Sequence, residues 1–154
     1  MPYSPAMVNI SRILCPIDFS ATSRRALQYA VTVSQKFGAE LTVLHVLEQV
    51  PLATAYAGRP EVDEIARAEE TVRSQLSVWM AAERDTQFKL ELGRGPTEET
   101  ILKACETGRY DLLVMGTHGR RLLDRALFGS VTHRVIRKAP CPVLLVRLLG
   151  PSLY

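Results

Sequence analysis

A glycine-rich stretch in the second half of the chain has the residue types and spacing of a phosphate-binding loop. Two residues separate Gly116 from Gly119, and after nine more residues Gly129 and Ser130 open a segment with helical periodicity. Glycine lets a backbone take positive φ and approach a ligand closely, and the first turn of a helix presents unpaired N–H groups with a positive partial charge. The stretch therefore predicts an anion site, to which the Ser130 and Thr132 hydroxyls would add hydrogen bonds.

Positive charge gathers in the same stretch. Between Gly116 and Ala139 there are six Lys or Arg residues against one acid, Asp124, although the whole chain of 154 residues has a net charge of only +3. Such a concentration favours an anionic ligand. Phe128 is the single Phe, Tyr or Trp among these residues, too few for a base-stacking surface, so a nucleic-acid partner is not expected. The basic residues are Arg120, Arg121, Arg125, Arg134, Arg137 and Lys138.

Spacing alone leaves a structural interpretation open. The glycines could simply turn the chain, Ser130 could simply cap its helix, and the arginines could be a solvated face. His118 and His133 flank the stretch, but the sequence fixes no acid beside either of them. No catalytic residue is assigned, and no metal site is expected from side chains.

The apolar periodicity predicts five strands alternating with four helices. This order is typical of an α/β fold, with an open parallel sheet covered by helices on both faces. Ligands of such sheets bind beyond the C-terminal ends of the strands, and the glycine-rich stretch follows the fourth strand. Strands are expected at residues 12–17, 40–46, 86–92, 111–116 and 142–149, and helices between Ser20 and Gly38 and at 61–84, 97–108 and 130–138.

Two of the strands differ in how they suit a sheet edge. Residues 86–92 alternate apolar and polar side chains, as expected for an edge strand with one wet face. The last strand, residues 142–149, is apolar and lacks alternating charges, so at the other edge it would be unprotected against pairing with another chain. Pro140 and Pro142 stand at its start, where a missing N–H does little harm.

The first helix is expected to begin with capping side chains. Asp18 and Ser20 can supply the caps, and Gly38 supplies a C-terminal stop. A cap uses one carboxylate oxygen, so a ligand role for Asp18 is compatible with it. The residues expected on one helical face are Leu27, Ala30, Val31, Ser34 and Phe37.

The composition is that of one soluble domain. Of the residues, 47% are hydrophobic and 23% are charged, so a single domain, residues 1–154 with a core at about 10–148, can bury its own core. The three cysteines lack the close spacing of a zinc site or redox pair. No stretch resembles a signal peptide or a membrane span, and a cytoplasmic location follows by elimination.

The stretch from Gly116 to Ser130 resembles the G-x2-G-x9-G-[S/T] loop of the universal stress proteins, with both gap lengths intact. The similarity leaves out only the two ends and the loop around residues 50–60. It implies a Rossmann-like sheet of the adenine nucleotide alpha hydrolase type, with strand order 3-2-1-4-5. Other matching stretches are CPIDFS, LTVLHV, VMGTHGR and GSVTHRVIRKAPCPVLLVR.

The resemblance also implies a ligand and its contacts. An intact loop is similar to that of the members that bind ATP, so ATP, ADP or AMP is expected, accompanied by Mg²⁺. Asp18 would lie near the adenine and ribose, with Pro16 and Ile17 shaping that turn, and the backbone of Val46 would meet the adenine edge. Met115 and Gly116 would lie under the ribose and phosphates, and Arg120 is a further candidate. The implied phosphate cradle is Gly119, Gly129, Ser130, Val131 and Thr132.

Three functions remain open at this point. The first is a regulatory module that binds nucleotide, and it would form a homodimer by pairing residues 142–148 across a two-fold axis, as the resemblance implies. The second is a slow ATPase or phosphotransferase; the Walker pattern GxxxxGK[ST] is absent, and fast turnover would need residues that the sequence does not show. The third is an interaction protein, with an unidentified protein partner and a structural nucleotide.

Overall fold

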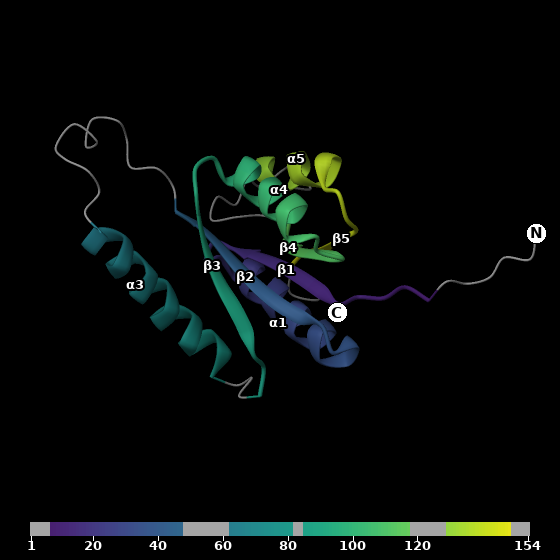
Figure 1. Cartoon of the computed structure of the whole chain (residues 1–154), viewed down its shortest axis with the longest axis horizontal. Coiled ribbons are helices and arrows are strands. Elements are labelled where there is room, and N and C mark those ends of the chain that lie inside the picture. Colours follow the sequence, from purple (N-terminus) through teal and green to yellow (C-terminus); the bar gives the residue numbers. More distant parts are fainter. Residues whose placement is uncertain (1–6, 48–61, 82–84, 118–128, 149–154) are drawn as a thin grey trace, which may run out of the picture.

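The computed structural model describes residues 7–47, 62–81, 85–117 and 129–148. Within these ranges, strands and helices alternate along the chain as predicted (Figure 1). The strands are β1 (Arg12–Ile17), β2 (Glu40–Leu47), β3 (Phe88–Arg94), β4 (Leu112–Gly116) and β5 (Val143–Val146). The helices are α1 (Ala21–Phe37), α3 (Val62–Met80), α4 (Thr97–Gly108) and α5 (Ser130–Lys138).

The sheet is parallel and open, with the order β3-β2-β1-β4-β5. This confirms the expected fold class and strand order. β1 pairs with β2 on one side and with β4 on the other, so the strand order reverses between β1 and β4. In open α/β sheets this switch point opens a crevice at the C-terminal ends of the strands.

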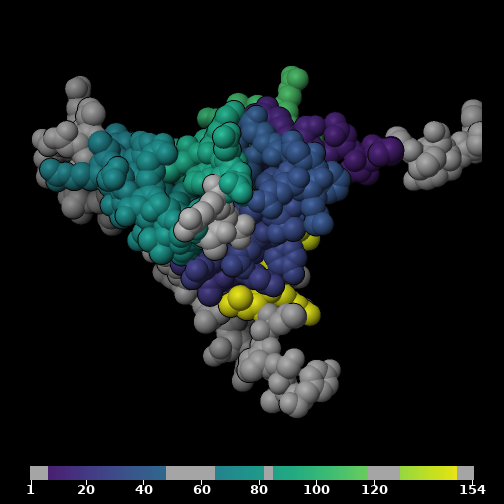
Figure 2. Space-filling model, turned by 90° about the horizontal axis from the view of Figure 1, so that it is seen from below, coloured from purple at the N-terminus to yellow at the C-terminus, as the bar shows by residue number. Residues whose placement is uncertain are grey.

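Helices cover both faces of the sheet (Figure 1). On one face, α1 and α3 pack against alternate side chains of β1, among them Ile13 and Cys15. On the other face, α4 and α5 pack against Leu14 and Leu113. Seen from below, α1 lies between the teal α3 and the yellow C-terminal segment (Figure 2).

Helix α1 begins and ends at residues with clear capping roles. Ser20 is the N-cap, and its side chain accepts a hydrogen bond from the N–H of Ser23 at 3.2 Å. Gly38 is the C-cap, with φ of 65°, a left-handed conformation that glycine adopts without a steric penalty. The predicted buried face is confirmed except at Phe37, which is 54% exposed in the last turn.

Several predicted boundaries are wrong by a few residues. The helix expected at 61–84 ends at Met80, and Ala81 lies in a turn. The strand expected at 86–92 runs from Phe88 to Arg94, because β2 continues to Leu47 and pairs there with Arg94. The last strand, expected at 142–149, is only Val143–Val146, because β4 ends at Gly116, opposite Val146.

Charged residues at the sheet lie either beside backbone N–H donors or in solvent. Asp111 lies outside β4, where its carboxylate accepts hydrogen bonds from the N–H groups of Ser11 and Arg12 at 2.8 and 2.9 Å. β3 is an edge strand whose Lys89 and Glu91 are exposed, as predicted. Among the described helices, none is both long enough and apolar enough to span a membrane.

Candidate functional site

The turn after β1 holds Asp18 in a defined orientation. One oxygen of its carboxylate accepts the N–H of Ser20 at 2.9 Å, and the N–H of Asp18 donates to the Ser23 hydroxyl at 3.4 Å. Ser20, and not Asp18, is the N-cap of α1. The prediction that Asp18 helps to cap α1 is therefore wrong. Its carboxylate instead closes the turn that leads into the helix.

The end of β4 and the start of α5 are held together by two hydrogen bonds. The N–H of Gly129 donates to the carbonyl of Thr117 at 2.7 Å, and the hydroxyl of Thr132 donates to the carbonyl of Gly116 at 3.1 Å. The N–H of Thr117 donates to Val146 at 2.9 Å, which fixes β4 to β5 at the same level. The two described ends of the glycine-rich stretch are therefore fixed beside each other at the C-terminal edge of the sheet.

The first turn of α5 offers donors for an anion. Gly129 is the N-cap residue of α5, and no side chain caps the helix there. The first hydrogen bond within the helix runs from the N–H of His133 to the carbonyl of Gly129, at 2.9 Å. The N–H groups of Ser130, Val131 and Thr132 precede the first intrahelical bond, so they have no acceptor within the helix. Ser130 is exposed, and the helix dipole adds a favourable partial charge for an anion.

Gly116 lies closely against the first turn of α1. A Cβ atom at this position would lie 3.0 Å from the backbone carbonyl carbon, the Cβ and the hydroxyl of Thr22, tighter than ordinary van der Waals contact. Thr22 is 4% exposed. The absence of a side chain at Gly116 therefore lets the β4 end and the α1 start, which carry the two halves of the candidate site, approach each other.

The structure brings most of the predicted site residues to one edge of the sheet. β1 and β2 pair with Ile17 opposite His45, so Val46 lies at the level of Asp18. Gly119 and Arg120, with His118, Arg121 and Arg125, lie outside the described residues. Those placed at this edge, on three neighbouring strands or at the start of α5, are Pro16, Ile17, Asp18, Val46, Met115, Gly116, Gly129, Ser130, Val131 and Thr132.

Part of the basic cluster has an acidic partner that the sequence count missed. Arg134 and Lys138 both reach Glu98 of α4, at 3.1 and 3.4 Å, and the Glu98 side chain is only 12% exposed. Only one acid accompanies the six basic residues between Gly116 and Ala139, because Glu98 lies on another helix. Two of the six are therefore ion-paired and serve to pack α5 against α4.

Sequence reasoning also missed Phe19, Thr22 and Thr117. Phe19 follows Asp18 and has φ of 62°. Thr22 lies closely against Gly116, and Thr117, the residue after Gly116, forms backbone hydrogen bonds with Val146 and Gly129. The run of hydroxyl side chains in the first turn of α1 could have indicated Thr22 from the sequence. No group of three or more His, Cys, Asp or Glu residues that could hold a metal ion occurs among the described side chains.

The open parallel sheet, with the start of α5 fixed beside the end of β4, defines a Rossmann-like α/β protein. Residues 9–147 match the universal stress protein family. The chain belongs to this family, which confirms the resemblance seen in the sequence.

Individual relatives are similar over most of their length. A universal stress protein of Thermus aquaticus, encoded in the 3' region of a QAH/OAS sulfhydrylase, is 36% identical over 140 residues, which are 88% of this chain and 97% of that protein. Universal stress protein MJ0577 of Methanocaldococcus jannaschii is 30% identical over 156 residues, covering 91% of this chain and 96% of its own.

Solved structures share the fold. The structure of MJ0577 has a TM-score of 0.77 at 29% identity and covers 94% of this chain and 100% of its own. A universal stress protein of Archaeoglobus fulgidus, solved in complex with dAMP, has a TM-score of 0.63 at 22% identity and covers 91% of this chain and 99% of its own. At that identity the second likeness shows the fold alone, and dAMP is a ligand of that protein.

Proposed function

We propose that this chain is a regulatory module that binds ATP, or ADP or AMP, at the C-terminal edge of the sheet between β1 and β4. One observation carries the proposal: the first turn of α5 is fixed beside the end of β4 by the Thr132–Gly116 and Gly129–Thr117 hydrogen bonds. This places a helix N-terminus at the switch point of an open α/β sheet, where such folds bind ligands. A dAMP complex of a protein with the same fold supports an adenine nucleotide.

The electrostatics orient the nucleotide in this proposal. The phosphates would meet the N–H groups of Ser130, Val131 and Thr132, where the helix dipole favours negative charge. Gly119 and Arg120 would add to this cradle, as the family loop implies. The carboxylate of Asp18 would repel phosphates, so it suits the other end of the ligand, where a ribose hydroxyl or the adenine amino group can donate to it.

The hydrophobic end of the ligand would lie over neighbouring strand ends. Val46 is 9% exposed at the end of β2, and Met115 is 5% exposed at the end of β4. With Pro16 and Ile17 at the end of β1, they offer an apolar floor for a purine ring, and the backbone of Val46 would meet the adenine edge.

Magnesium would arrive with the nucleotide in this proposal. Oxygen donors are what Mg²⁺ requires, and it commonly takes them from phosphates and water. The hydroxyl of Ser130, exposed at the start of α5, would be an oxygen donor beside the proposed phosphates. The ion would neutralise phosphate charge there.

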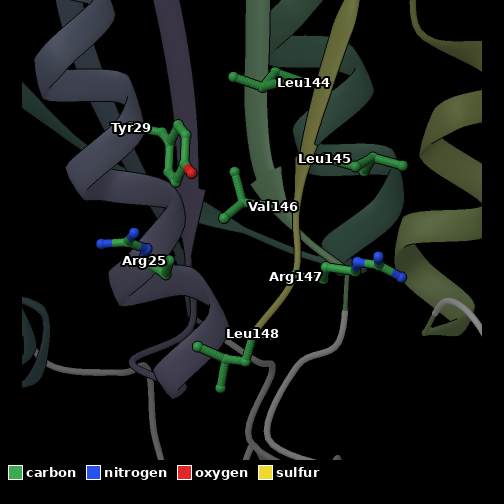
Figure 3. A pocket seen from close by; sticks show the side chains of 7 residues that line it. All are labelled: Arg25, Tyr29, Leu144, Leu145, Val146, Arg147 and Leu148. Atoms are coloured by element: carbon green, nitrogen blue, oxygen red, sulfur yellow. The ribbon is translucent and has the colours of Figure 1, made fainter. Parts of the chain in front are cut away.

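A homodimer is the second part of the proposal. β5 ends the sheet order and pairs only with β4 among the described strands, and an unprotected apolar edge favours pairing with another strand. Beside it lies a groove of about 510 Å³, lined by Arg25 and Tyr29 of α1 and by residues 144–148. Leu144 and Val146 point toward α1, and Leu145 points away from it (Figure 3). A second copy would cover this edge.

The nucleotide proposal is tested with a ligand series. Purified, nucleotide-stripped protein is titrated by calorimetry with Mg·ATP, Mg·ADP, AMP and adenosine, with Mg·GTP as the control for the base. We expect affinity to fall as phosphates are removed and to be weaker for GTP. Absence of binding to every adenine compound at millimolar concentration would contradict the proposal.

Two further measurements separate the alternatives. Phosphate release from Mg·ATP distinguishes a binding module from an ATPase, and we expect no more than slow turnover. Fractionation of cells that express the tagged chain tests the cytoplasmic location, which stays a prediction.

A further inference from the structure

Phe19 has a backbone conformation that its side chain disfavours. Its φ is 62°, and Arg109, with φ of 49°, is the one other non-glycine residue with positive φ in the described part of the chain. Arg109 is the C-cap of α4, where left-handed residues are common. Phe19 instead lies between Asp18 and the N-cap of α1, and for a bulky residue this conformation is a genuine outlier.

Strained residues persist only where their surroundings determine them, and they concentrate at functional sites. The surroundings of Phe19 are two aromatic rings from different elements. Its ring centroid lies 5.1 Å from that of His45 in β2 and 5.0 Å from that of Trp79 in α3, with interplanar angles of 58° and 59°. Tilted pairs at these distances are favourable aromatic contacts.

His45 is itself fixed to the same turn. Its Nδ1–H donates to the carbonyl of Ile17 at 2.9 Å, two residues before Phe19. Trp79 packs against the core at the end of α3 and has the guanidinium of Arg24 5.8 Å from its ring centroid. Phe19 is thus held from β2 on one side and from α3 on the other.

The conformation of Phe19 determines where Asp18 points. A left-handed residue after Asp18 reverses the chain, and the N–H of Ser20 then returns to the Asp18 carboxylate at 2.9 Å. The same reversal places Ser20 as the N-cap of α1. If the Phe19 ring lost its contacts, the turn could relax to an ordinary φ, and the Asp18 carboxylate would move with it.

We propose that Phe19, held between His45 and Trp79, is the positioning residue that keeps the Asp18 carboxylate in place for the nucleotide and couples the nucleotide site to α3. The inference rests on the proposed function. It adds a residue that does not touch the ligand and an element, α3, that would respond to nucleotide occupancy.

The test compares Phe19→Ala with Phe88→Ala. Phe88 packs against the same core cluster, but it stands at the start of β3, the end of the sheet opposite to the candidate site. Both variants truncate a phenylalanine side chain that packs against the same core cluster, so both should lower the free energy of unfolding. We expect Phe19→Ala to weaken Mg·ATP binding roughly tenfold, a change of about 1.4 kcal/mol, and Phe88→Ala to leave the affinity unchanged.

Two more variants separate the ring from the backbone. Phe19→Gly relieves the left-handed strain, so it should fold even if Phe19→Ala does not, and we expect it to weaken binding to a similar degree. Phe19→Tyr keeps the ring and should retain wild-type affinity. Equal affinity of wild type, Phe19→Ala and Phe19→Gly would overturn the inference.

Trp79 supplies a spectroscopic readout, since it is the single tryptophan of the chain. We expect Mg·ATP to change its fluorescence in the wild type and in Phe88→Ala but not in Phe19→Gly. An identical nucleotide-induced change in Phe19→Gly would contradict the coupling to α3. Absence of nucleotide binding by the wild type would overturn the proposed function itself, whereas binding that is insensitive to Phe19 would overturn this inference alone.

Discussion

The hydroxyl of Thr132, in the first turn of α5, donates a 3.1 Å hydrogen bond to the backbone carbonyl of Gly116 at the end of β4. Sixteen residues separate the two along the chain, and Thr132 is only 3% exposed. This contact fixes the orientation of the α5 N-terminus relative to the strand end. The position of the proposed phosphate cradle therefore depends on this side-chain hydrogen bond together with the backbone bond from Gly129 to Thr117.

Thr132→Val should weaken both the fold and the site. Valine has nearly the same shape but cannot donate, so the Gly116 carbonyl loses a buried partner, at a cost of about 1–2 kcal/mol. Urea denaturation measures the stability, and calorimetry measures the affinity for Mg·ATP, which should fall. Thr107→Val is the control, because the Thr107 hydroxyl bonds to Lys103 on the exposed face of α4. Equal urea midpoints for the two variants would count against this role for Thr132.

Asp18→Asn should weaken nucleotide binding without unfolding the turn. Asparagine keeps an oxygen that can accept the Ser20 N–H, but it replaces the other carboxylate oxygen by a donor. We expect affinity for adenosine and for Mg·ATP to fall roughly tenfold alike, since the loss is at the ribose and adenine end. Asp111→Asn makes the same change at the opposite edge of the sheet, where Asp111 accepts two backbone N–H groups. Undiminished affinity of Asp18→Asn would exclude the assigned role.

Cys15 should make stability fall at alkaline pH. Complete burial in the core raises the pKa of this thiol from 9.0 to about 12. Below pH 9 both the folded and the unfolded chain hold the proton, whereas between pH 9 and 12 the unfolded chain releases it first, so the stability contribution is progressively lost. At pH 10 the loss from this group is about 1.4 kcal/mol.

Cys15→Ala should therefore lose less stability than the wild type between pH 8 and pH 10 in urea denaturation. Val43→Ala is the matched control, because Val43 is equally buried in the same cluster and does not titrate. Its pH dependence should parallel that of the wild type. A Cys15→Ala curve parallel to both would show that Cys15 is not responsible.

Leu148→Asp should weaken the proposed homodimer. Leu148 is a 48% exposed apolar residue that lines the groove between α1 and β5, and a charge there would be desolvated by a second copy at substantial cost. We expect light scattering to report a monomer at concentrations where the wild type is a dimer. Val78→Asp, at a 69% exposed position on α3, should remain dimeric. A monomeric wild type would refute the dimer itself.

Most of the fold could be predicted from the sequence because strand and helix periods differ strongly. The apolar runs of β1, β2 and β4 are each buried on both faces, and alternation in β3 marks its exposed side. Boundaries were less predictable, because they depend on register. Gly93 and Arg94 extend β3 because their partners Val46 and Leu47 continue β2, which no local pattern indicates.

Features of the candidate site that lie within one short stretch of sequence could be predicted. Contacts between elements that are distant in the sequence could not. The spacing of Gly116, Gly129 and Ser130 is read directly from the chain. The ion pairs of Glu98 join helices that lie far apart in the sequence, and the contacts of Phe19 come from β2 and α3. A one-residue left-handed turn has no signature when phenylalanine occupies it, since glycine is the usual choice.

Gly129→Glu tests nucleotide binding at this loop most directly. Gly129 has φ of −65° and ψ of 160°, values that any residue adopts, so the variant should keep its fold while placing bulk and negative charge where phosphate is proposed to lie. Thr107→Glu adds the same charge on α4 as a control, and circular dichroism checks the fold of both. In calorimetric titrations of nucleotide-stripped protein with Mg·ATP, we expect the wild type and Thr107→Glu to bind and Gly129→Glu not to bind. Binding by a folded Gly129→Glu variant with unchanged affinity, or no binding by the wild type, would contradict the assignment of this loop as the nucleotide site.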